Sequence, residues 1–359
     1  MSEARFIEVI KPGMLTLIQD LGRYGYQQFG VPVAGAMDQF AAAVANLLVG
    51  NDRSDAVLEM MMMGPELKLN FDGQIALTGA DLGPKINGAP VAAWQTLAVS
   101  SGDVLSFAGL KSGLRGYLAV RGGIDTLPVM NSRSTYTKAA LGGFEGRALK
   151  AGDQVPVGAE GTGTATVPLA IPQDQIPVYG VSKTIRVVLG PQDDAFTEAG
   201  LQTFLENIYT VTNECDRMGY RLEGPSIDHV KGGDIISDGI AFGAVQVPGH
   251  GKPIIMMADR QTTGGYTKIA GVISVDLPLL AQSKPGDQIR FKRVSLEEAH
   301  ELLKARKDFY GEIPEMTAAM PINLAEARNP ISQDIISTRL FRLNVAGAVY
   351  DVKVEEVRV

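Results

Sequence analysis

Short apolar runs that end at turn-forming residues recur along most of this chain. Four of them are ELKLNF, GQIALTG, DVLSFAG and RGYLAVRGG, and each lies between glycine, proline, aspartate or asparagine residues. Runs of this length with these boundaries are typical of β-strands joined by tight turns. Residues for such turns are plentiful, because the chain contains 41 glycines and 19 prolines among its 359 residues. The sequence therefore predicts a mostly β fold.

A few helices interrupt the predicted strands. In AMDQFAAAVANLLVGN the apolar residues recur at helical spacing, Asp38 is the expected N-cap, and the Gly-Asn pair ends the helix. A second helix is predicted in DDAFTEAGLQTFLEN, with Asp193 or Asp194 as its cap. A third, SLEEAHELLKARKDFYG, begins with Ser295 as N-cap and has Glu298 at the capping-box position. The predicted fold class is therefore mostly β with a few helices.

The length of the chain favours two domains, since one hydrophobic core rarely holds 359 residues. The segments GDVLSFAG and GDQIRFKR share a pattern, and each closes a strand-rich block, which indicates two β-barrel-like domains of similar plan. A Gly/Thr/Pro-rich segment separates the blocks. The predicted boundaries are 1–160 for an N-terminal β domain, 161–183 for a linker, 184–310 for a C-terminal β domain with a closing helix, 311–336 for an extended linker, and 337–359 for a β-hairpin tail that turns at Ala346-Gly347.

Charge and composition exclude several classes of partner. The net charge is −7 and no cluster of lysine or arginine is present, whereas nucleic-acid surfaces are basic. No apolar run reaches the roughly 20 residues of a membrane helix, and the N-terminus does not resemble a signal peptide. The one cysteine, Cys215, cannot form an internal disulfide, so we expect a cytoplasmic location. The three histidines lack metal-binding spacing, and no metal site is predicted.

The segment PIIMMADRQTTGGYTKIA places polar residues between two apolar runs. Asp259 and Arg260 follow the first run directly, and Gln261, two threonines, two glycines and Tyr266 come next. One interpretation is a hairpin turn in which the glycine pair supplies positive φ angles and the threonines cap the turn. The other is a loop that faces a ligand, where the glycines allow close approach to backbone N–H groups. The charge pair directly after an apolar strand favours the second interpretation.

Four further segments combine polar side chains with glycine or hydroxyl residues. They supply Gln19, Asp20 and Arg23 in IQDLGRYGY, Arg217, Met218 and Gly219 in CDRMGYRLEGP, Thr78, Gly79 and Ala80 in LTGAD, and Arg133 in NSRSTYTK. Each segment also has an ordinary explanation, as a solvated loop or a tight turn. A phosphate-binding P-loop is not among the candidates, because no G-x-x-x-x-G-K-[ST] motif occurs.

Seven motifs resemble those of one protein family, both in their residues and in their order along the chain. They are IQDLGRYGYQQFGVPVAGAMDQFAAAVANLLVGN, LTGAD, RGYLAVRGG, SRSTY, LGPQDDAF, DRMGYRLEGP and MADRQTTGGYTKIA. Together they are similar to the biotin-dependent carboxyltransferase family, also called allophanate hydrolase subunit 2 or the KipA type, over about residues 6–300. That family includes the bacterial 5-oxoprolinase subunit designated C and a part of the carboxyltransferase region of urea carboxylase.

The resemblance implies two cyclophilin-like β-barrel domains in tandem. It also implies a KipI-type partner (allophanate hydrolase subunit 1), an active cleft shared between the chains, and a small amide or ureido substrate. The favoured function is ATP-dependent hydrolysis of 5-oxoproline to glutamate, as a subunit of a multi-subunit enzyme. The alternatives are biotin-dependent carboxyl transfer to urea or a related amide, and a non-catalytic regulatory protein that antagonises a KipI-type inhibitor.

No covalently bound cofactor is predicted. The methionine run EMMMMGPEL contains no lysine between its methionines that could carry biotin. The tail LFRLNVAGAVYDVKVEEV looks like the opening strands of a biotinyl carrier domain, cut off before any acceptor lysine. ATP or carboxybiotin would therefore be supplied by a partner.

Residue types suggest the roles that either reaction requires. A small planar amide needs donors to a carbonyl oxygen that becomes more negative, and an acceptor for its N–H. Arginine suits the first task, and aspartate can accept an N–H or orient an arginine. The predicted catalytic residues are Arg260, Asp259, Arg217, Arg23 and Asp20. The predicted substrate-binding residues are Gln19, Thr78, Gly79, Ala80, Arg133, Met218, Gly219, Gln261, Thr262, Thr263, Gly264, Gly265 and Tyr266. The hypothesis requires the arginines to converge on one place.

Overall fold

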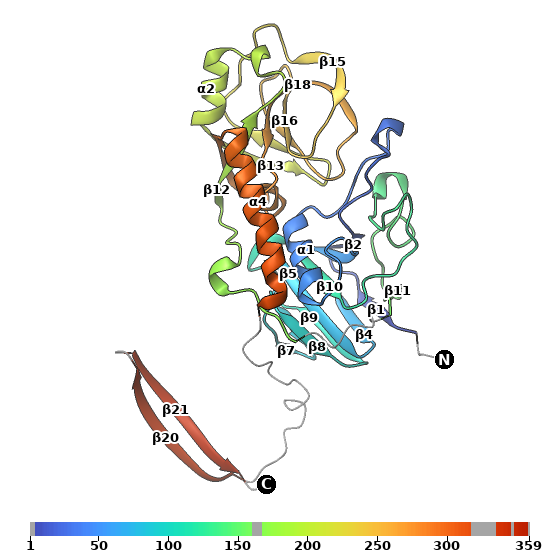
Figure 1. The fold of residues 1–359 in the computed structure, drawn as a ribbon, viewed down its shortest axis with the longest axis vertical. Helices are drawn as coiled ribbons and strands as arrows, with labels where there is room; N and C mark the ends of the chain where they lie inside the picture. Colours follow the sequence, from blue (N-terminus) through green and yellow to red (C-terminus); the bar gives the residue numbers. More distant parts are fainter. Residues whose placement is uncertain (1–3, 160–166, 317–334, 346–347, 358–359) are drawn as a thin grey trace. The chain divides into compact units, whose positions relative to one another are not determined.

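The computed structural model describes residues 4–159, 167–316, 335–345 and 348–357. Within these residues the fold is mostly β, with four α-helices (Figure 1). Residues 1–319 form one compact unit and residues 320–359 form another. The mostly β class that the sequence predicts is confirmed.

Two antiparallel sheets make up the N-terminal half of the first unit. One has the strand order β11-β1-β4-β9-β6-β7 and the other the order β2-β3-β10-β5-β8. The bounds are β1 Phe6–Lys11, β2 Leu15–Gln19, β3 Val57–Met61, β4 Glu66–Asn70, β5 Gly73–Asp81, β6 Pro84–Ile86, β7 Ala89–Pro90, β8 Thr96–Val99, β9 Asp103–Phe107, β10 Ser112–Val120 and β11 Gln154–Pro156. Alternate residues of β1 and β4, such as Ile7 and Leu67, are buried, which is the period expected of a strand with one inward face.

Helix α1 (Gln39–Leu48) packs against the second of these sheets. The side chain of Asp38 caps it by accepting a hydrogen bond from the Ala41 N–H at 2.8 Å, as the sequence predicts. Small alanines let the helix lie close to β5, and the Thr78 hydroxyl donates to the Ala41 carbonyl at 2.7 Å. The N-terminal end of α1 is therefore fixed in position.

The C-terminal half of the first unit contains one eight-stranded sheet of order β12-β19-β13-β14-β17-β16-β18-β15. The bounds are β12 Ser182–Leu189, β13 Ile208–Cys215, β14 Gly219–Glu223, β15 Asp234–Gly239, β16 Ala244–Val247, β17 Ile254–Met256, β18 Thr263–Val272 and β19 Gln288–Arg293. Strand β18, which is next to last in this order, also pairs with β12, which is first. Two barrels in tandem are not confirmed, because the N-terminal strands form two separate sheets.

Three helices belong to the C-terminal half of the first unit: α2 (Glu198–Glu206), α3 (Leu277–Ala281) and α4 (Leu296–Glu312). Ser295 caps α4 by accepting from the Glu298 N–H at 3.1 Å, which confirms the predicted cap. The predicted cap of α2 is wrong. Asp193 lies in a preceding 3-10 turn, and Thr197 has the extended backbone of an N-cap, so that its hydroxyl accepts from the Gly200 N–H at 2.9 Å instead.

Buried polar contacts join the two halves of the first unit. The Gln282 side chain accepts hydrogen bonds from the Leu114 and Arg115 N–H groups at 2.8 and 2.9 Å, and it donates to Asp38 at 2.9 Å. The Arg115 guanidinium donates to the Tyr220 hydroxyl at 2.7 Å. Part of the segment predicted as a linker also packs on the N-terminal half, where the Ile171 N–H donates to the Trp94 carbonyl at 2.9 Å. These contacts fix the relative placement of the loops that carry the predicted site residues.

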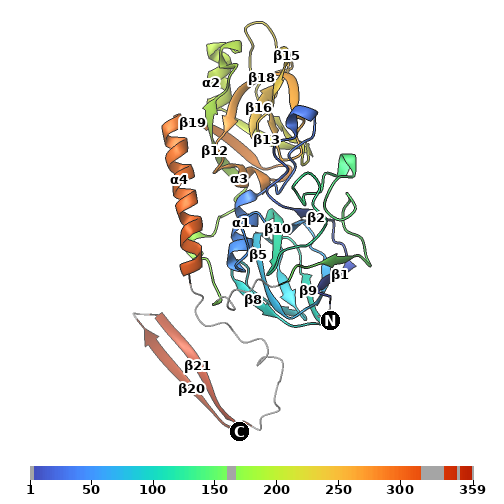
Figure 2. The same cartoon turned by 45° about the vertical axis from the view of Figure 1, so that its right-hand side comes forward.

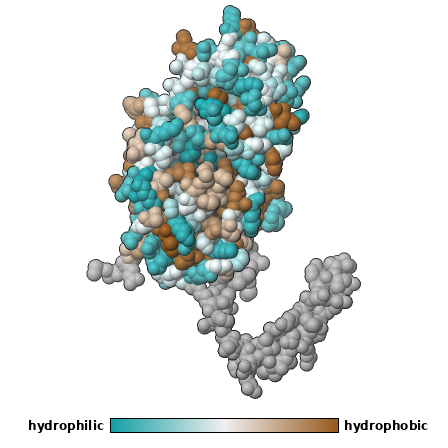
Figure 3. Space-filling model, turned by 180° about the vertical axis from the view of Figure 1, so that it is seen from behind, coloured by the Kyte–Doolittle hydropathy of each residue, from teal (hydrophilic) through white to brown (hydrophobic). Residues whose placement is uncertain are grey.

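The exterior offers two further observations. Among the described residues no helix is both long and apolar enough to cross a membrane. The face behind that of Figure 1 carries its hydrophobic residues in separate patches, with hydrophilic residues between them (Figure 3).

The second unit contains the antiparallel strands β20 (Ile335–Val345) and β21 (Ala348–Val357), with Val345 opposite Ala348. The predicted turn at 346–347 lies outside the described residues, as do residues 160–166 and 317–334 of the predicted linkers. A 3-10 turn at Ile313–Glu315 follows α4 at the start of the second predicted linker. The predicted domain boundaries stay predictions.

Candidate active site

The turn after β17 and the turn before β14 meet in a buried ion pair. Arg217 contacts Asp259 twice, from Nε to Oδ2 at 3.0 Å and from Nη2 to Oδ1 at 2.9 Å. The two turns are adjacent because β14 and β17 are hydrogen-bonded neighbours, and the Asp259 N–H donates to the Arg217 carbonyl at 2.7 Å. Both side chains are buried. Two of the predicted segments are therefore brought together by strand pairing.

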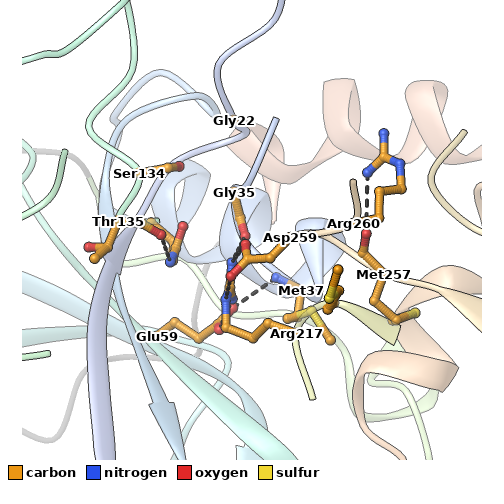
Figure 4. A network of polar contacts seen from close by, with 12 residues as sticks. Gly22, Gly35, Met37, Glu59, Ser134, Thr135, Arg217, Met257, Asp259 and Arg260 are labelled. Carbon is orange, nitrogen blue, oxygen red and sulfur yellow. Dashed lines mark hydrogen bonds and ion pairs between the residues drawn. The ribbon is translucent and has the colours of Figure 1, made fainter. Parts of the chain in front are cut away.

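Arg217 also reaches into the N-terminal half (Figure 4). Its Nη2 donates to the Gly35 carbonyl at 2.6 Å, and its Nη1 pairs with Glu59. Glu59 in turn accepts from the Met37 N–H and the Tyr117 hydroxyl, each at 2.8 Å. Burial by itself lowers the pKa of Arg217, but the carboxylates of Asp259 and Glu59 outweigh it and hold that pKa above its ordinary value. Protein partners thus occupy four of the five N–H groups of Arg217.

Glu59 is a site residue that sequence reasoning missed. The available signal was a carboxylate inside the apolar strand β3, because a charged residue on a buried strand needs a partner.

Arg23 lies in the loop after β2 and has no solvent-exposed surface. Its Nη2 donates to the Ser134 carbonyl at 2.6 Å, and its Nε donates to the Val129 carbonyl at 3.4 Å. A side chain at Gly142, whose φ is +67°, would collide with the Ser134 carbonyl and the Arg23 guanidinium. Burial lowers the pKa of Arg23, while the nearby carboxylates of Asp20 and Asp259 oppose this shift. Arg23 and Arg217 therefore both lie near Asp259.

Gln19 and Asp20 hold the loop at 132–135 against the end of β2. The Gln19 Nε2 donates to the Thr135 carbonyl at 3.0 Å. The Asp20 carboxylate accepts hydrogen bonds from the Gly22 N–H at 2.8 Å, the Ser132 hydroxyl at 2.8 Å, the Arg133 N–H at 2.6 Å and the Ser134 hydroxyl. A carboxylate with four donors has little capacity left for a ligand. These contacts favour an organising role for Asp20 over the predicted catalytic one.

Arg260 is close to Asp259 but is not paired with it. Its Nε donates to the Ile240 carbonyl at 3.0 Å, its Nη1 donates to the Met257 carbonyl at 3.3 Å, and its guanidinium lies 5.4 Å from the centre of the Phe242 ring. In Figure 4 it points away from the pair formed by Arg217 and Asp259. Burial lowers the pKa of Arg260, and its electrostatic interactions with Tyr24 and Asp259 oppose this shift.

Three buried polar atoms near these loops lack a hydrogen-bond partner within the described part of the chain. They are Nη1 of Arg23, Oε1 of Gln19 and Oε1 of Gln261. Buried polar atoms are nearly always paired, so that such atoms indicate a ligand or an ordered water. One is a donor and two are acceptors.

The remaining predicted residues lie elsewhere or make other contacts. In β5, Thr78 binds α1, Gly79 faces the Arg115 carbonyl and Gln282, and Ala80 is buried beside them. The Arg133 guanidinium contacts Asp125 at 2.8 Å and the Thr126 carbonyl at 2.7 Å. The N–H groups of Met218 and Gly219 both donate to Asp216, at 2.7 and 3.1 Å. None of these contacts involves Asp259.

The segment TTGGY is a strand from its second threonine onward, and not a turn. Thr263, Gly264, Gly265 and Tyr266 begin β18, which pairs with β15, and neither glycine has a positive φ. The hairpin interpretation with positive φ angles is therefore wrong, because the turn falls earlier, around Asp259. A side chain at Gly264 would meet the side chains of Ile240 and Gln246, so that the glycine serves packing. The Thr262 carbonyl accepts from the Ile240 N–H at 3.0 Å.

The arrangement brings three arginines close to the carboxylates of Asp20, Glu59 and Asp259. Asp259 and Glu59 are engaged by Arg217, whereas Arg23 and Arg260 form no ion pair with any described residue. Fixed cations and donors in a site without water stabilise negative charge that develops on a carbonyl oxygen. No group of three His, Cys, Asp or Glu side chains in the described ranges is placed to hold a metal ion.

Comparisons with known proteins identify the family of this chain. Residues 29–293 match the family described as carboxyltransferase domain, subdomain A and B. The chain is 39% identical over 307 residues to the Escherichia coli K12 5-oxoprolinase subunit designated C, which covers 84% of this chain and 94% of that protein. The chain therefore belongs to the carboxyltransferase domain family, and the resemblance seen in the motifs is confirmed.

Two larger proteins contain a region similar to this chain. Urea amidolyase of Saccharomyces cerevisiae is 33% identical over 320 residues, which are 85% of this chain but 17% of that protein. The crystal structure of Kluyveromyces lactis urea carboxylase matches with a TM-score of 0.82 and 28% identity, over 94% of this chain and 32% of that one. The present chain thus spans only a part of these relatives.

Proposed function

We propose that this chain is a subunit of an enzyme that hydrolyses 5-oxoproline to glutamate with ATP. The observation that carries the proposal is the match to the 5-oxoprolinase subunit of Escherichia coli, which spans 94% of that relative. The match to urea amidolyase covers 17% of its length, so that most of that enzyme has no counterpart here. A whole-length relative is the better guide to what the chain does.

The reaction sets clear demands on the site. The ring C–N bond breaks, an oxygen from water joins the former carbonyl carbon, and the nitrogen leaves as an amine, while ATP becomes ADP and phosphate. Negative charge develops on the carbonyl oxygen before the ring opens. A donor at that oxygen and an acceptor at the ring N–H would orient the amide and favour this step.

We assign these tasks to Arg23 and Gln19. The two side chains are anchored on the neighbouring carbonyl groups of Ser134 and Thr135, at 2.6 and 3.0 Å. The unpartnered Nη1 of Arg23 is a donor and the unpartnered Oε1 of Gln19 is an acceptor. A donor and an acceptor on adjacent anchors match the adjacent C=O and N–H of an amide.

Arg217, Asp259 and Asp20 act as positioning residues in this scheme. Four of the five N–H groups of Arg217 are occupied by Asp259, Glu59 and Gly35, so that little donor capacity is left for a substrate. Asp20 organises the loop whose carbonyls anchor Arg23 and Gln19. Arg260 adds positive charge close to Asp259.

The site also needs a partner. Arg23 and Gln19 have no solvent-exposed surface, so that a substrate reaches them only after part of the covering loops moves. Two of these loops lie side by side (Figures 1 and 2), and the Asn131 side chain contacts the Tyr26 hydroxyl at 3.3 Å. Both loops expose apolar side chains: Tyr24 59%, Phe29 72%, Leu127 81% and Met130 40%.

Exposed apolar side chains beside a buried site are typical of a surface that another protein covers. They support a KipI-type partner that docks on these loops and opens the site, in a cytoplasmic complex to which ATP is supplied. We therefore expect the isolated chain to be inactive.

Reconstitution tests the proposal. The chain is mixed with its KipI-type partner and the third component of a 5-oxoprolinase, and ATP and 5-oxoproline are added. We expect glutamate and ADP in equal amounts, and none when this chain is left out. Glutamate formation at the same rate without this chain would contradict the proposal.

Carboxyl transfer is the second candidate. It is favoured by the family description and by the structural match to urea carboxylase, with a TM-score of 0.82 over 94% of this chain. In that case the site would hold urea or a related amide, and carboxybiotin from another chain would transfer its carboxyl group to the substrate nitrogen. An assay with carboxybiotin and urea measures loss of the carboxyl group. If both assays are silent, the regulatory role of a KipA-type protein is favoured.

A further inference from the structure

A cleft of about 340 Å³ lies between α1, α3 and α4, and neither Arg217 nor Asp259 lines it. We call it the α1–α4 cleft; α4 runs lengthwise past α1 in both Figure 1 and Figure 2. Its walls include Tyr24, Met37, Phe40 and Phe242, together with residues of α3 and α4. This volume is at the lower end of the range for small-molecule sites.

Three cations line the α1–α4 cleft and no carboxylate does. They are Arg53, Arg306 and Lys307, in a chain whose net charge is −7. Nowhere in the described ranges does any of the three form an ion pair. Asp52 and Asp38 act electrostatically on Arg53 and Arg306 but do not line the cleft, so that an anion bound between the three cations would further reduce their mutual repulsion.

The two arginines are held in place by the walls. The Arg306 Nη2 donates to the Val275 carbonyl at 3.0 Å, and its guanidinium lies 4.4 Å from the centre of the Phe40 ring. The Arg53 guanidinium lies 5.9 Å from the centre of the Tyr310 ring. These contacts orient the guanidinium groups without neutralising them. Planar guanidinium groups pair well with carboxylate and phosphate oxygens.

One carboxylate close to Arg306 has other partners. Asp38 lies close enough to Arg306 to affect its electrostatics, but it is buried, caps α1 and accepts from Gln282. It does not line the cleft. The apolar lining residues Met37, Phe40, Leu277 and Pro278 are buried, whereas Arg53 and Lys307 are exposed. The cleft therefore combines a cationic mouth with an apolar interior.

We propose that the α1–α4 cleft binds a small organic anion, with a carboxylate or phosphate group at Arg53, Arg306 and Lys307 and the rest of the molecule against the apolar wall. The shared chemistry is an oxyanion on an apolar body, and its source is either a nucleotide or a carboxylic acid. Binding is measured without turnover or a partner, so that this inference stands or falls independently of the proposed function.

Equilibrium dialysis of the full chain at low salt tests the proposal with three probes: ATP, pyrophosphate and 5-oxoproline. Binding of ATP or pyrophosphate assigns the site to a phosphate, and binding of 5-oxoproline alone assigns it to a carboxylate. We expect Lys307→Glu to weaken binding about tenfold or more, because it removes one charge-assisted contact and adds a repulsion. Arg53→Glu is expected to act in the same direction.

Lys304→Glu is the matched control. Lys304 is exposed on the same helix and does not line the cleft, and its replacement changes the net charge by the same amount. We expect its affinity to stay within about twofold of the wild type, as for a remote surface charge. The proposal is overturned if no probe binds at millimolar concentration, or if Lys304→Glu and Lys307→Glu weaken binding equally.

Discussion

Arg217 and Asp259 are joined inside the protein by two contacts, Nε to Oδ2 at 3.0 Å and Nη2 to Oδ1 at 2.9 Å. The same arginine holds Glu59 and the Gly35 carbonyl, so that one side chain connects four segments that are distant in the sequence. The pair thereby ties the C-terminal turns to the N-terminal loops that carry the candidate site. We expect loss of this pair to affect the stability of the protein more directly than it affects catalysis.

We expect Asp259→Ala to lower the free energy of unfolding by about 3–5 kcal/mol, because Arg217 stays buried with one carboxylate fewer. The remaining contact with Glu59 places the loss toward the lower end of this range. Urea unfolding measures it. The control is Glu66→Ala, which breaks the exposed contact with Lys11 at 2.6 Å and should cost less than about 1 kcal/mol. Similar losses in the two variants would argue against the buried pair as a stabilising link.

The buried cap of α1 predicts an unusual pH dependence. Burial raises the pKa of Asp38 from 3.8 to about 6, although hydrogen bonds from Ala41 and Gln282 act in the opposite direction. The folded chain therefore keeps a proton that the unfolded chain releases from about pH 4 upward. The stability that this group contributes is full below about pH 4 and is lost as the pH rises to about 6, by about 3 kcal/mol.

Asp38→Asn isolates this effect. It retains an oxygen acceptor for the Ala41 N–H, and any constant cost of the replacement shifts the whole curve without changing its slope. We expect the unfolding free energy of the wild type, minus that of the variant, to fall between about pH 4 and 6 and to be constant above this window. Urea unfolding at a series of pH values measures the difference. A difference that does not change with pH would show that Asp38 titrates normally.

Asp20→Asn tests the organising role of that carboxylate. The amide can accept fewer hydrogen bonds than the carboxylate and brings two donors of its own, so that the loop at 132–135 should open more often. We expect hydrogen exchange of the Arg133 and Ser134 N–H groups to be about 10–100-fold faster, the equivalent of a lost charged hydrogen bond. The control is Asp125→Asn, which breaks the more exposed contact with Arg133. If exchange at this loop is unchanged in Asp20→Asn, the carboxylate does not hold it.

The sequence predicted the strands, α1 and its Asp38 cap because these depend on local pattern. It also placed Arg23, Arg217 and Asp259 in distinctive motifs, and the fold brings them together. It could not show that Arg217 is paired with Asp259 and Glu59, since this depends on how β3, β14 and β17 are arranged in space. This is why we propose a positioning role for Arg217 in place of the predicted catalytic one.

At two places a local sequence pattern is compatible with two different structures. The Gly264–Gly265 pair is typical of a turn, but the pairing of β18 with β15 requires an extended backbone, and Gly264 gives space to Ile240 and Gln246. Asp193 is a good helix cap by type, yet Thr197 caps α2 because the chain forms a 3-10 turn first. Tertiary contacts decide such cases, and these contacts cannot be derived from a single sequence.

The most direct test of the candidate site is the turnover of Arg23→Lys in the reconstituted complex with 5-oxoproline and ATP. The lysine keeps the charge and can still reach the Ser134 carbonyl, but it lacks the second arm that carries Nη1. We expect kcat/KM to fall about 10²–10³-fold, as for the loss of one preorganised donor, with little change in the melting temperature. Arg133→Lys, whose guanidinium contacts Asp125 and Thr126 instead, should stay within about threefold of the wild type. Wild-type turnover in Arg23→Lys, or an equal loss in Arg133→Lys, would contradict the assignment of Arg23 to the amide carbonyl.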